Sequence, residues 1–191
     1  MAKVVIFLGS VRHNRQGIKV AKFLEDKLKE RSHEVFLADA QKYELPLLDK
    51  MHKEYEEGKA PEVMEMLSKK IRGADGFIMV TAEYNHGPPA GLKNMIDHFQ
   101  SEYFFKPSAI ASYSDGSFGG VRAAIHLRAV LAELGMPTIP TMFPVPKIKE
   151  AFDEDGKPLD EAYNRRIVKF LDEFEWYMEA FANQRKKGTP Y

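Results

Sequence analysis

"KVVIFLGSVRHNRQG" occupies residues 3–17 and joins an apolar run to a polar loop that holds two arginines. The run from Lys3 to Gly9 does not alternate between polar and apolar residues, so it predicts a strand that is covered on both faces. A helix is predicted from Gln16 to Arg31, because apolar residues recur there every four positions, at Val20, Leu24 and Leu28. The opposite side of that helix carries Lys19, Lys22, Glu25, Asp26 and Lys29.

The same alternation of apolar runs and helical patterns continues along the chain. Further strands are predicted at residues 33–39, 76–81, 107–114 and 138–146, and further helices within 60–75, 91–99 and 119–135. The last strand is expected to be short, because prolines cannot donate hydrogen bonds to a ladder. Five strands separated by helices predict an α/β fold with a parallel sheet and helices on both faces. The expected arrangement is a flavodoxin-like, doubly wound sheet in the order 2-1-3-4-5.

The last part of the chain adds a turn and a long helix. Between residues 151 and 159, Asp-Gly lies between two apolar flanks, which is a hairpin signal. The final helix is predicted from Asp160 to Ala182, and both its aromatic stripe and Trp176 are expected in the core. Its broad apolar face comprises Ile167, Phe170, Leu171, Phe174, Tyr177, Met178 and Phe181. We expect one domain over residues 1–191, with the core in 1–147 and the hairpin and helix in 148–191.

Composition excludes several classes of function. The chain has 28 basic and 28 acidic residues, so no overall field favours nucleic acid or an anionic membrane. It has no cysteine, which excludes disulfides, thiolate nucleophiles and thiolate metal sites. No histidine–carboxylate cluster suggests a catalytic metal. The first apolar run is too short for a signal peptide, and no stretch approaches the roughly 18 apolar residues of a membrane span, so we expect a cytoplasmic protein.

The loop from Gly9 to Gly17 has the composition of an anion site. Ligands of open α/β sheets bind beyond the carboxyl ends of the strands, and the start of a helix favours negative charge. Ser10, Arg12 and Arg15 offer a hydroxyl and two guanidinium groups, and the nearby backbone amides add further donors. The alternative is a solvated polar turn. The sequence has neither the triphosphate-binding loop nor the G-x-G-x-x-G motif, which leaves a monophosphate as the expected anion.

Two further loops follow predicted strands and are therefore expected at the same carboxyl edge of the sheet as the first loop. In "TAEYNHGPPAGLKNMIDHF", residues 81–99, Tyr84 can stack on a flat ring, and the Asn85 amide can pair with the edge of a heterocycle. The prolines of that loop stiffen it. The stretch "YSDGSFGG", residues 113–120, is rich in glycine and so allows close approach of backbone to a ligand.

With these loops in view, the sequence resembles the NADPH-dependent FMN reductases, which include flavodoxin-like quinone and azo reductases. The resemblance rests on "GSVRHNRQG", "EYNHGPPAGLKNMID" and "SDGSFGGVRAAIHLRAVLAELGM", and it covers roughly Val4 to Pro146. It implies a bound FMN whose phosphate lies on Ser10, Arg12, Arg15, Gln16 and Gly17. The flavin ring would lie against Glu83, Tyr84, Asn85 and His86, and Ser114, Asp115 and Gly116 would close the site. One departure is Ala82, where the family commonly has proline, and this puts cofactor affinity in question more than identity.

The resemblance implies an FMN-dependent enzyme that passes hydride from NADPH or NADH to a quinone, an azo compound or free flavin. Catalytic side chains are not expected, because the cofactor carries the chemistry. His86 is a candidate for proton transfer, with an exposed loop histidine as the alternative. The resemblance also implies a homodimer or homotetramer, and the aromatic residues of "HFQSEYFFKP" are either a subunit contact or internal packing. The alternative functions are an electron carrier or redox sensor that does not turn over NAD(P)H, and a nucleotide-binding regulator without redox chemistry.

Overall fold

The computed structural model describes all 191 residues around a sheet of five parallel strands. The strands are β1 (Lys3–Leu8), β2 (Glu34–Asp39), β3 (Gly76–Ala82), β4 (Ser108–Tyr113) and β5 (Thr138–Val145). Their order in the sheet is β2-β1-β3-β4-β5, and every neighbouring pair is parallel. The predicted fold class and strand order are therefore confirmed.

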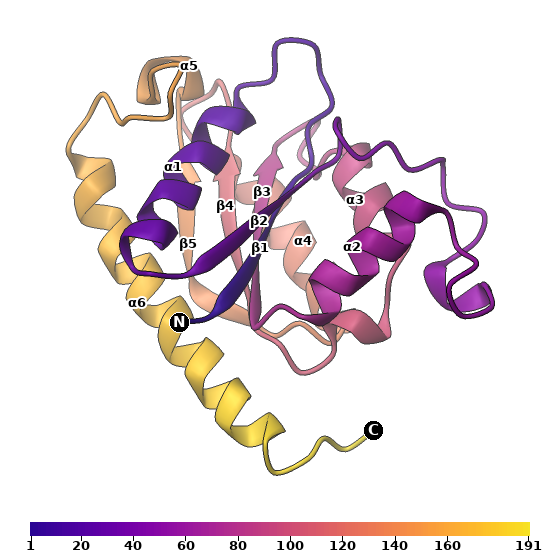
Figure 1. Cartoon of the computed structure of the whole chain (residues 1–191). Helices are drawn as coiled ribbons and strands as arrows, with labels where there is room; N and C mark the ends of the chain where they lie inside the picture. Colours follow the sequence, from indigo (N-terminus) through magenta and orange to yellow (C-terminus); the bar gives the residue numbers. More distant parts are fainter.

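Helices cover both faces of the sheet (Figure 1). The helices α1 (Gly17–Glu30) and α6 (Ala162–Arg185) pack on one face. The other face is covered by α2 (Glu62–Arg72), α3 (Ala90–Asp97) and α4 (Val121–Glu133). Short 3-10 turns occur at His52–Glu54 and Ser101–Tyr103, and the short helix α5 (Ile148–Ala151) lies near the start of α1. No helix combines the length and the apolar character that a membrane crossing requires.

Each central strand contributes to a hydrophobic core on both faces of the sheet. Along β1, Ile6 and Leu8 are buried on the side of α1 and α6, whereas Val5 and Phe7 are buried on the side of α2, α3 and α4. Successive side chains of a strand point to opposite faces, so a strand covered on both sides is apolar at every position. This is why the first run of the sequence lacks alternation.

The fifth strand is not shortened by its prolines, contrary to expectation. β5 has eight residues and is the longest strand of the sheet, although it contains Pro140 and Pro144. It tolerates them because it lies at the edge of the sheet, where one side of its backbone has no neighbouring strand. Side chains cover part of that free side: Glu173 accepts a hydrogen bond from the amide of Thr141 (3.1 Å), and Arg166 donates to the carbonyl of Pro144 (2.7 Å). The edge is thereby protected from pairing with another chain.

The C-terminal segment returns to the face that carries α1. The predicted hairpin is a tight turn with a single antiparallel bridge, between Phe152 and Pro158. On α6, five residues of the predicted apolar face are fully buried, and Tyr177 and Phe181 are half-buried. The expectation that Trp176 lies in the core is wrong, because its side chain is 66% exposed. Two residues along a helix correspond to about 200°, so Trp176 faces away from the buried Phe174 and Met178.

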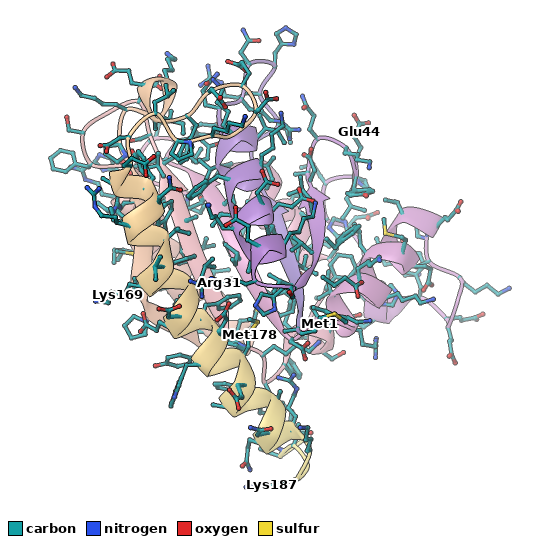
Figure 2. All side chains as sticks on the ribbon, turned by 60° about the vertical axis from the view of Figure 1, so that its left-hand side comes forward. Met1, Arg31, Glu44, Lys169, Met178 and Lys187 are labelled. Carbon is teal, nitrogen blue, oxygen red and sulfur yellow. The ribbon has the colours of Figure 1, made fainter.

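Ion pairs fasten α6 to the end of α1. Arg31 donates to Asp172 (2.7 Å) and to Glu175 (3.1 Å) of α6, and Figure 2 shows Arg31 beside α6, close to Met178. In the aromatic segment near residue 100, Phe99 and Tyr103 are fully buried within the chain. Internal packing therefore accounts for these two rings.

Candidate functional site

A cavity of about 760 Å³ opens at the carboxyl edge of the sheet, where the loops after β1, β3 and β4 meet. Its fourth wall is formed by the segment that contains α5. Six predicted site residues line it: Arg12, Arg15, Gln16, Glu83, Tyr84 and Asp115. The volume lies in the range that small-molecule and cofactor sites occupy, roughly 300–1,000 Å³. The tertiary structure thus brings together loops that are far apart in sequence.

The floor of the first loop is held by Ser10 and Arg15. Ser10 is fully buried, and its hydroxyl is hydrogen-bonded to the hydroxyl of Tyr84 (2.6 Å). Arg15 forms a two-pronged ion pair with Asp39 at the end of β2, and one of its terminal nitrogens also donates to the carbonyl of Ser10 (3.0 Å). The side chains of Arg15 and Asp39 are only 11% and 10% exposed. Arg15 therefore fixes the shape of the loop while it lines the cavity.

Arg12 occupies a different environment. It is exposed, and its guanidinium lies 5.7 Å from the centre of the Tyr84 ring. The other charged groups of the cavity wall are paired with one another or with a neighbour: Arg15 with Asp39, Lys19 with Glu154, Lys149 with Asp115 and Glu83 with Arg122. Arg12 takes part in no ion pair, so its positive charge is available to an anionic ligand.

The start of α1 also faces the first loop without a cap. Gln16 precedes the helix, and no side chain accepts a hydrogen bond from its first amides. The side-chain amide of Gln16 points elsewhere and donates to the carbonyl of Asn14 (3.2 Å). The first turn contains no acidic residue. Free amides and an unneutralised helix dipole attract an anion to this position.

The second loop forms a tight turn at its tip. Tyr84 and Gly87 exchange two backbone hydrogen bonds (2.9 and 3.0 Å), and between them Asn85 and His86 have positive φ angles of 51° and 66°. Left-handed φ at both central positions is the geometry of a two-residue hairpin turn. Both side chains are exposed and neither lines the cavity. Contact of Asn85 and His86 with a flavin ring stays a prediction.

Glu83 connects this turn to α4. Its carboxylate accepts hydrogen bonds from the amides of Arg122 (3.1 Å) and Ala123 (3.3 Å), at the first turn of that helix. The Arg122 guanidinium approaches the same carboxylate at 3.4 Å. A carboxylate at a helix start pairs with free amides and with the helix dipole. Glu83 therefore positions the second loop through α4.

Glu83→Ala should lower the free energy of unfolding by about 1 kcal/mol, as expected for the loss of a helix cap. Glu83→Gln should cost less, because an amide oxygen still accepts the hydrogen bonds. Urea unfolding of both variants measures the two losses. An unchanged urea midpoint for Glu83→Ala would contradict the capping role.

The third loop closes against the segment after β5. The amides of Lys147 and Ile148 donate to the carbonyls of Gly116 (3.2 Å) and Ser114 (3.1 Å). Asp115 lines the cavity and pairs with Lys149 at 3.0 Å, but both side chains are largely exposed, so this pair contributes little stability. Ser114 and Gly116 do not line the cavity. Their participation in the site stays a prediction.

Two residues that the sequence did not single out also line the cavity. Lys19, expected on the open side of α1, is buried and pairs with Glu154 at 2.7 Å, because the segment after α5 covers that part of the helix. Tyr113, the last residue of β4, is only 5% exposed, and its ring lies on the α1 side of the sheet with Ala109 and Ala111. Ala109, Ala111 and Tyr113 are two residues apart along a strand, and this spacing could have predicted that they share one face of the sheet.

Comparison with known proteins agrees with this geometry. The model of the family described as NADPH-dependent FMN reductase matches residues 2–150, which includes all three loops of the cavity. The chain belongs to the NADPH-dependent FMN reductase family. A quinone reductase of Escherichia coli strain K12 is 39% identical over 140 residues, which is 69% of this chain and 70% of the relative.

Other proteins similar to this chain are named for different acceptors. An NADH:(hydroxy)cinnamate reductase subunit of Vibrio ruber is 32% identical over 142 residues, covering 71% of this chain and 70% of the relative. Among solved structures, the NAD(P)H:(acceptor) oxidoreductase FerB of Paracoccus denitrificans superposes with a TM-score of 0.76 at 28% identity. That match covers 95% of this chain and 99% of FerB, so the C-terminal helix is part of it.

Proposed function

We propose that the protein is an FMN-dependent NAD(P)H oxidoreductase that passes hydride from NADPH or NADH, through bound FMN, to a quinone, an azo compound or free flavin. When bound, FMN supplies the redox chemistry, and the protein supplies binding and orientation. Membership of the FMN reductase family supports the reaction class. The E. coli relative named quinone reductase supports a quinone as acceptor.

The observation that carries the proposal is the coincidence of Arg12 and the uncapped start of α1 in one cavity. In the proposed complex, the FMN phosphate accepts hydrogen bonds from Arg12 and from the amides at Gln16 and Gly17. Ser10 and Arg15 support the loop from below through their bonds to Tyr84 and Asp39. A phosphate fits this end of the cavity because the unpaired charge of Arg12 and the positive end of the α1 dipole would together offset its negative charge.

The flavin ring is proposed to lie against the second loop. Tyr84 lines the cavity and is tied to Ser10, so its orientation is set before a ligand arrives. Backbone groups of the turn from Glu83 to His86 are the proposed partners of the ring edge, with Asp115 and its neighbours Ser114 and Gly116 opposite. Backbone donors at this edge would stabilise negative charge on the reduced ring.

An anaerobic titration tests the proposed function. The purified full chain, supplied with FMN, should be yellow and should lose its absorbance near 450 nm on addition of NADPH or NADH. A quinone added afterwards should restore the colour, and the same assay with azo compounds and free flavin ranks the acceptors. Colour that persists after both nicotinamide nucleotides would favour an electron carrier. Failure to bind FMN would contradict the proposal and would favour a nucleotide-binding regulator.

We also propose that the protein works as a homodimer or homotetramer, as its resemblance to the family implies. Light scattering of the purified protein should then give a mass of two or four times 21.8 kDa. A mass of one chain would contradict this proposal.

A further inference from the structure

The hydroxyl of Tyr113 is a buried polar group without a partner. Tyr113 ends β4 and is only 5% exposed. Its hydroxyl oxygen neither accepts nor donates a hydrogen bond in the structure. Buried hydroxyl groups in folded proteins are nearly always paired, so an unpaired one calls for an explanation. Packing of the ring does not require the oxygen, because phenylalanine has the same apolar body.

The hydroxyl lies against the first residue of α1. A Cβ atom placed on Gly17 would lie only 2.4 Å from the Tyr113 oxygen. Tyr113 therefore fills the space that a side chain at position 17 would need. This places the phenol directly beside the helix start that no side chain caps, within the cavity that Arg12 also lines.

Burial raises the pKa of Tyr113 above its ordinary value of 10, so the phenol stays protonated at neutral pH. A protonated phenol donates a hydrogen bond and brings no negative charge of its own. Ser10, Tyr84, Arg15 and the backbone of Gly17 are its polar neighbours. None of these groups is hydrogen-bonded to the phenol in the structure, which leaves the Tyr113 proton without an acceptor inside the protein.

We infer that the Tyr113 hydroxyl is a further phosphate ligand, which donates a hydrogen bond to the phosphate of FMN beside the first amides of α1. Gly17 is the complementary requirement, because any side chain there would displace the phenol. This inference rests on the proposed function. It adds to the proposed site a group that contacts the phosphate of FMN and makes no contact with the flavin ring. Tyr113 should therefore help the protein to distinguish FMN from riboflavin, which lacks the phosphate.

The test removes the hydroxyl and keeps the ring. Wild type, Tyr113→Phe and the control Tyr103→Phe are prepared as full chains freed of co-purified flavin. Tyr103 is a matched control because it is also fully buried, but its hydroxyl donates to the carbonyl of Ile96 in the core on the opposite face. Isothermal titration calorimetry then gives the Kd of each protein for FMN and for riboflavin.

Tyr113→Phe should raise the Kd for FMN about tenfold or more, as expected for a hydrogen bond to a charged group, and should leave the Kd for riboflavin unchanged. Without ligand, this variant should unfold at a urea concentration no lower than the wild type, because it loses no hydrogen bond. Tyr103→Phe should lose stability and keep both Kd values.

Three outcomes would overturn the inference. An FMN Kd of Tyr113→Phe within about twofold of the wild-type value would show that the hydroxyl does not meet the phosphate. An equal loss of riboflavin binding would show that the residue acts through packing. Wild-type protein that binds no FMN would overturn both this inference and the proposed function, whereas the first two outcomes leave the proposed function standing.

Discussion

Arg15→Met should lower the free energy of unfolding by about 3–5 kcal/mol, the loss expected when one partner of a buried ion pair is removed. The variant leaves the Asp39 carboxylate at 10% exposure with only the amide of Gln41, at 2.9 Å, to accommodate it. It also removes the hydrogen bond to the Ser10 carbonyl, so the first loop loses its attachment to β2. FMN affinity should fall as well, because the loop is no longer held in shape.

Arg12→Met is the matched control, since it makes the same substitution in the same loop. Arg12 is exposed and has no ion-pair partner, so the free energy of unfolding should stay within about 0.5 kcal/mol of the wild-type value. Its FMN Kd should nevertheless rise about tenfold or more, through loss of a charged hydrogen bond to the phosphate. Urea unfolding and calorimetry separate the two effects. Equal loss of stability in both variants would contradict the separate roles of the two arginines.

The second large effect is a rise in stability with pH that depends on Lys106. Its ammonium group is buried and donates to three backbone carbonyls, those of Ile71 (2.9 Å), Arg72 (2.7 Å) and Glu102 (2.8 Å). Burial, followed by the nearby positive charge of Arg185, lowers the pKa of Lys106 from 10.5 to about 8. Between these two pH values the unfolded chain keeps a proton that the folded chain has released. The unfolded state therefore binds more protons, and stability increases with pH.

Lys106→Met should abolish this dependence. The gap between the two pKa values corresponds to about 3 kcal/mol, so the wild type should gain up to that amount relative to the variant between pH 8 and pH 10.5. Urea unfolding at several pH values measures the difference. Lys69→Met is the control, because Lys69 lies in the last turn of α2, the helix whose final carbonyls accept hydrogen bonds from Lys106, but is itself exposed. If the difference in free energy of unfolding between the wild type and Lys106→Met stayed constant across this pH range, the prediction would be wrong.

The strands and helices could be predicted closely because their periodicity records local burial. β1 is apolar at every position since two layers of helices cover it, and α1 repeats its apolar residues every four positions because one stripe meets the sheet. The length of β5 could not be predicted in this way. Its prolines are tolerated because it is an edge strand, and position in the sheet is a property of the whole fold.

Trp176 shows a second limit of sequence patterns. The apolar face of α6 is broad, so its boundary cannot be placed from hydrophobicity alone. Packing against β5 decides where burial ends, and it leaves Trp176 outside. Lys19 shows the converse case, because a residue with the polarity of an exposed position is buried by a segment more than 130 residues away.

The sequence by itself determined the strands, the helices and the three loops that form the cavity, because these follow from residue patterns within short windows. The strand order was expected from the doubly wound architecture that alternating strands and helices favour. Only the tertiary structure decided which polar groups in those loops are free. The sequence pattern does not distinguish Arg12 from Arg15. Asp39 lies 24 residues from Arg15 in the chain, and the two residues form an ion pair because β1 and β2 are neighbours in the sheet. Charge neutralisation depends on distance in space, so the folded chain alone separates the arginine that supports the loop from the one that faces a ligand.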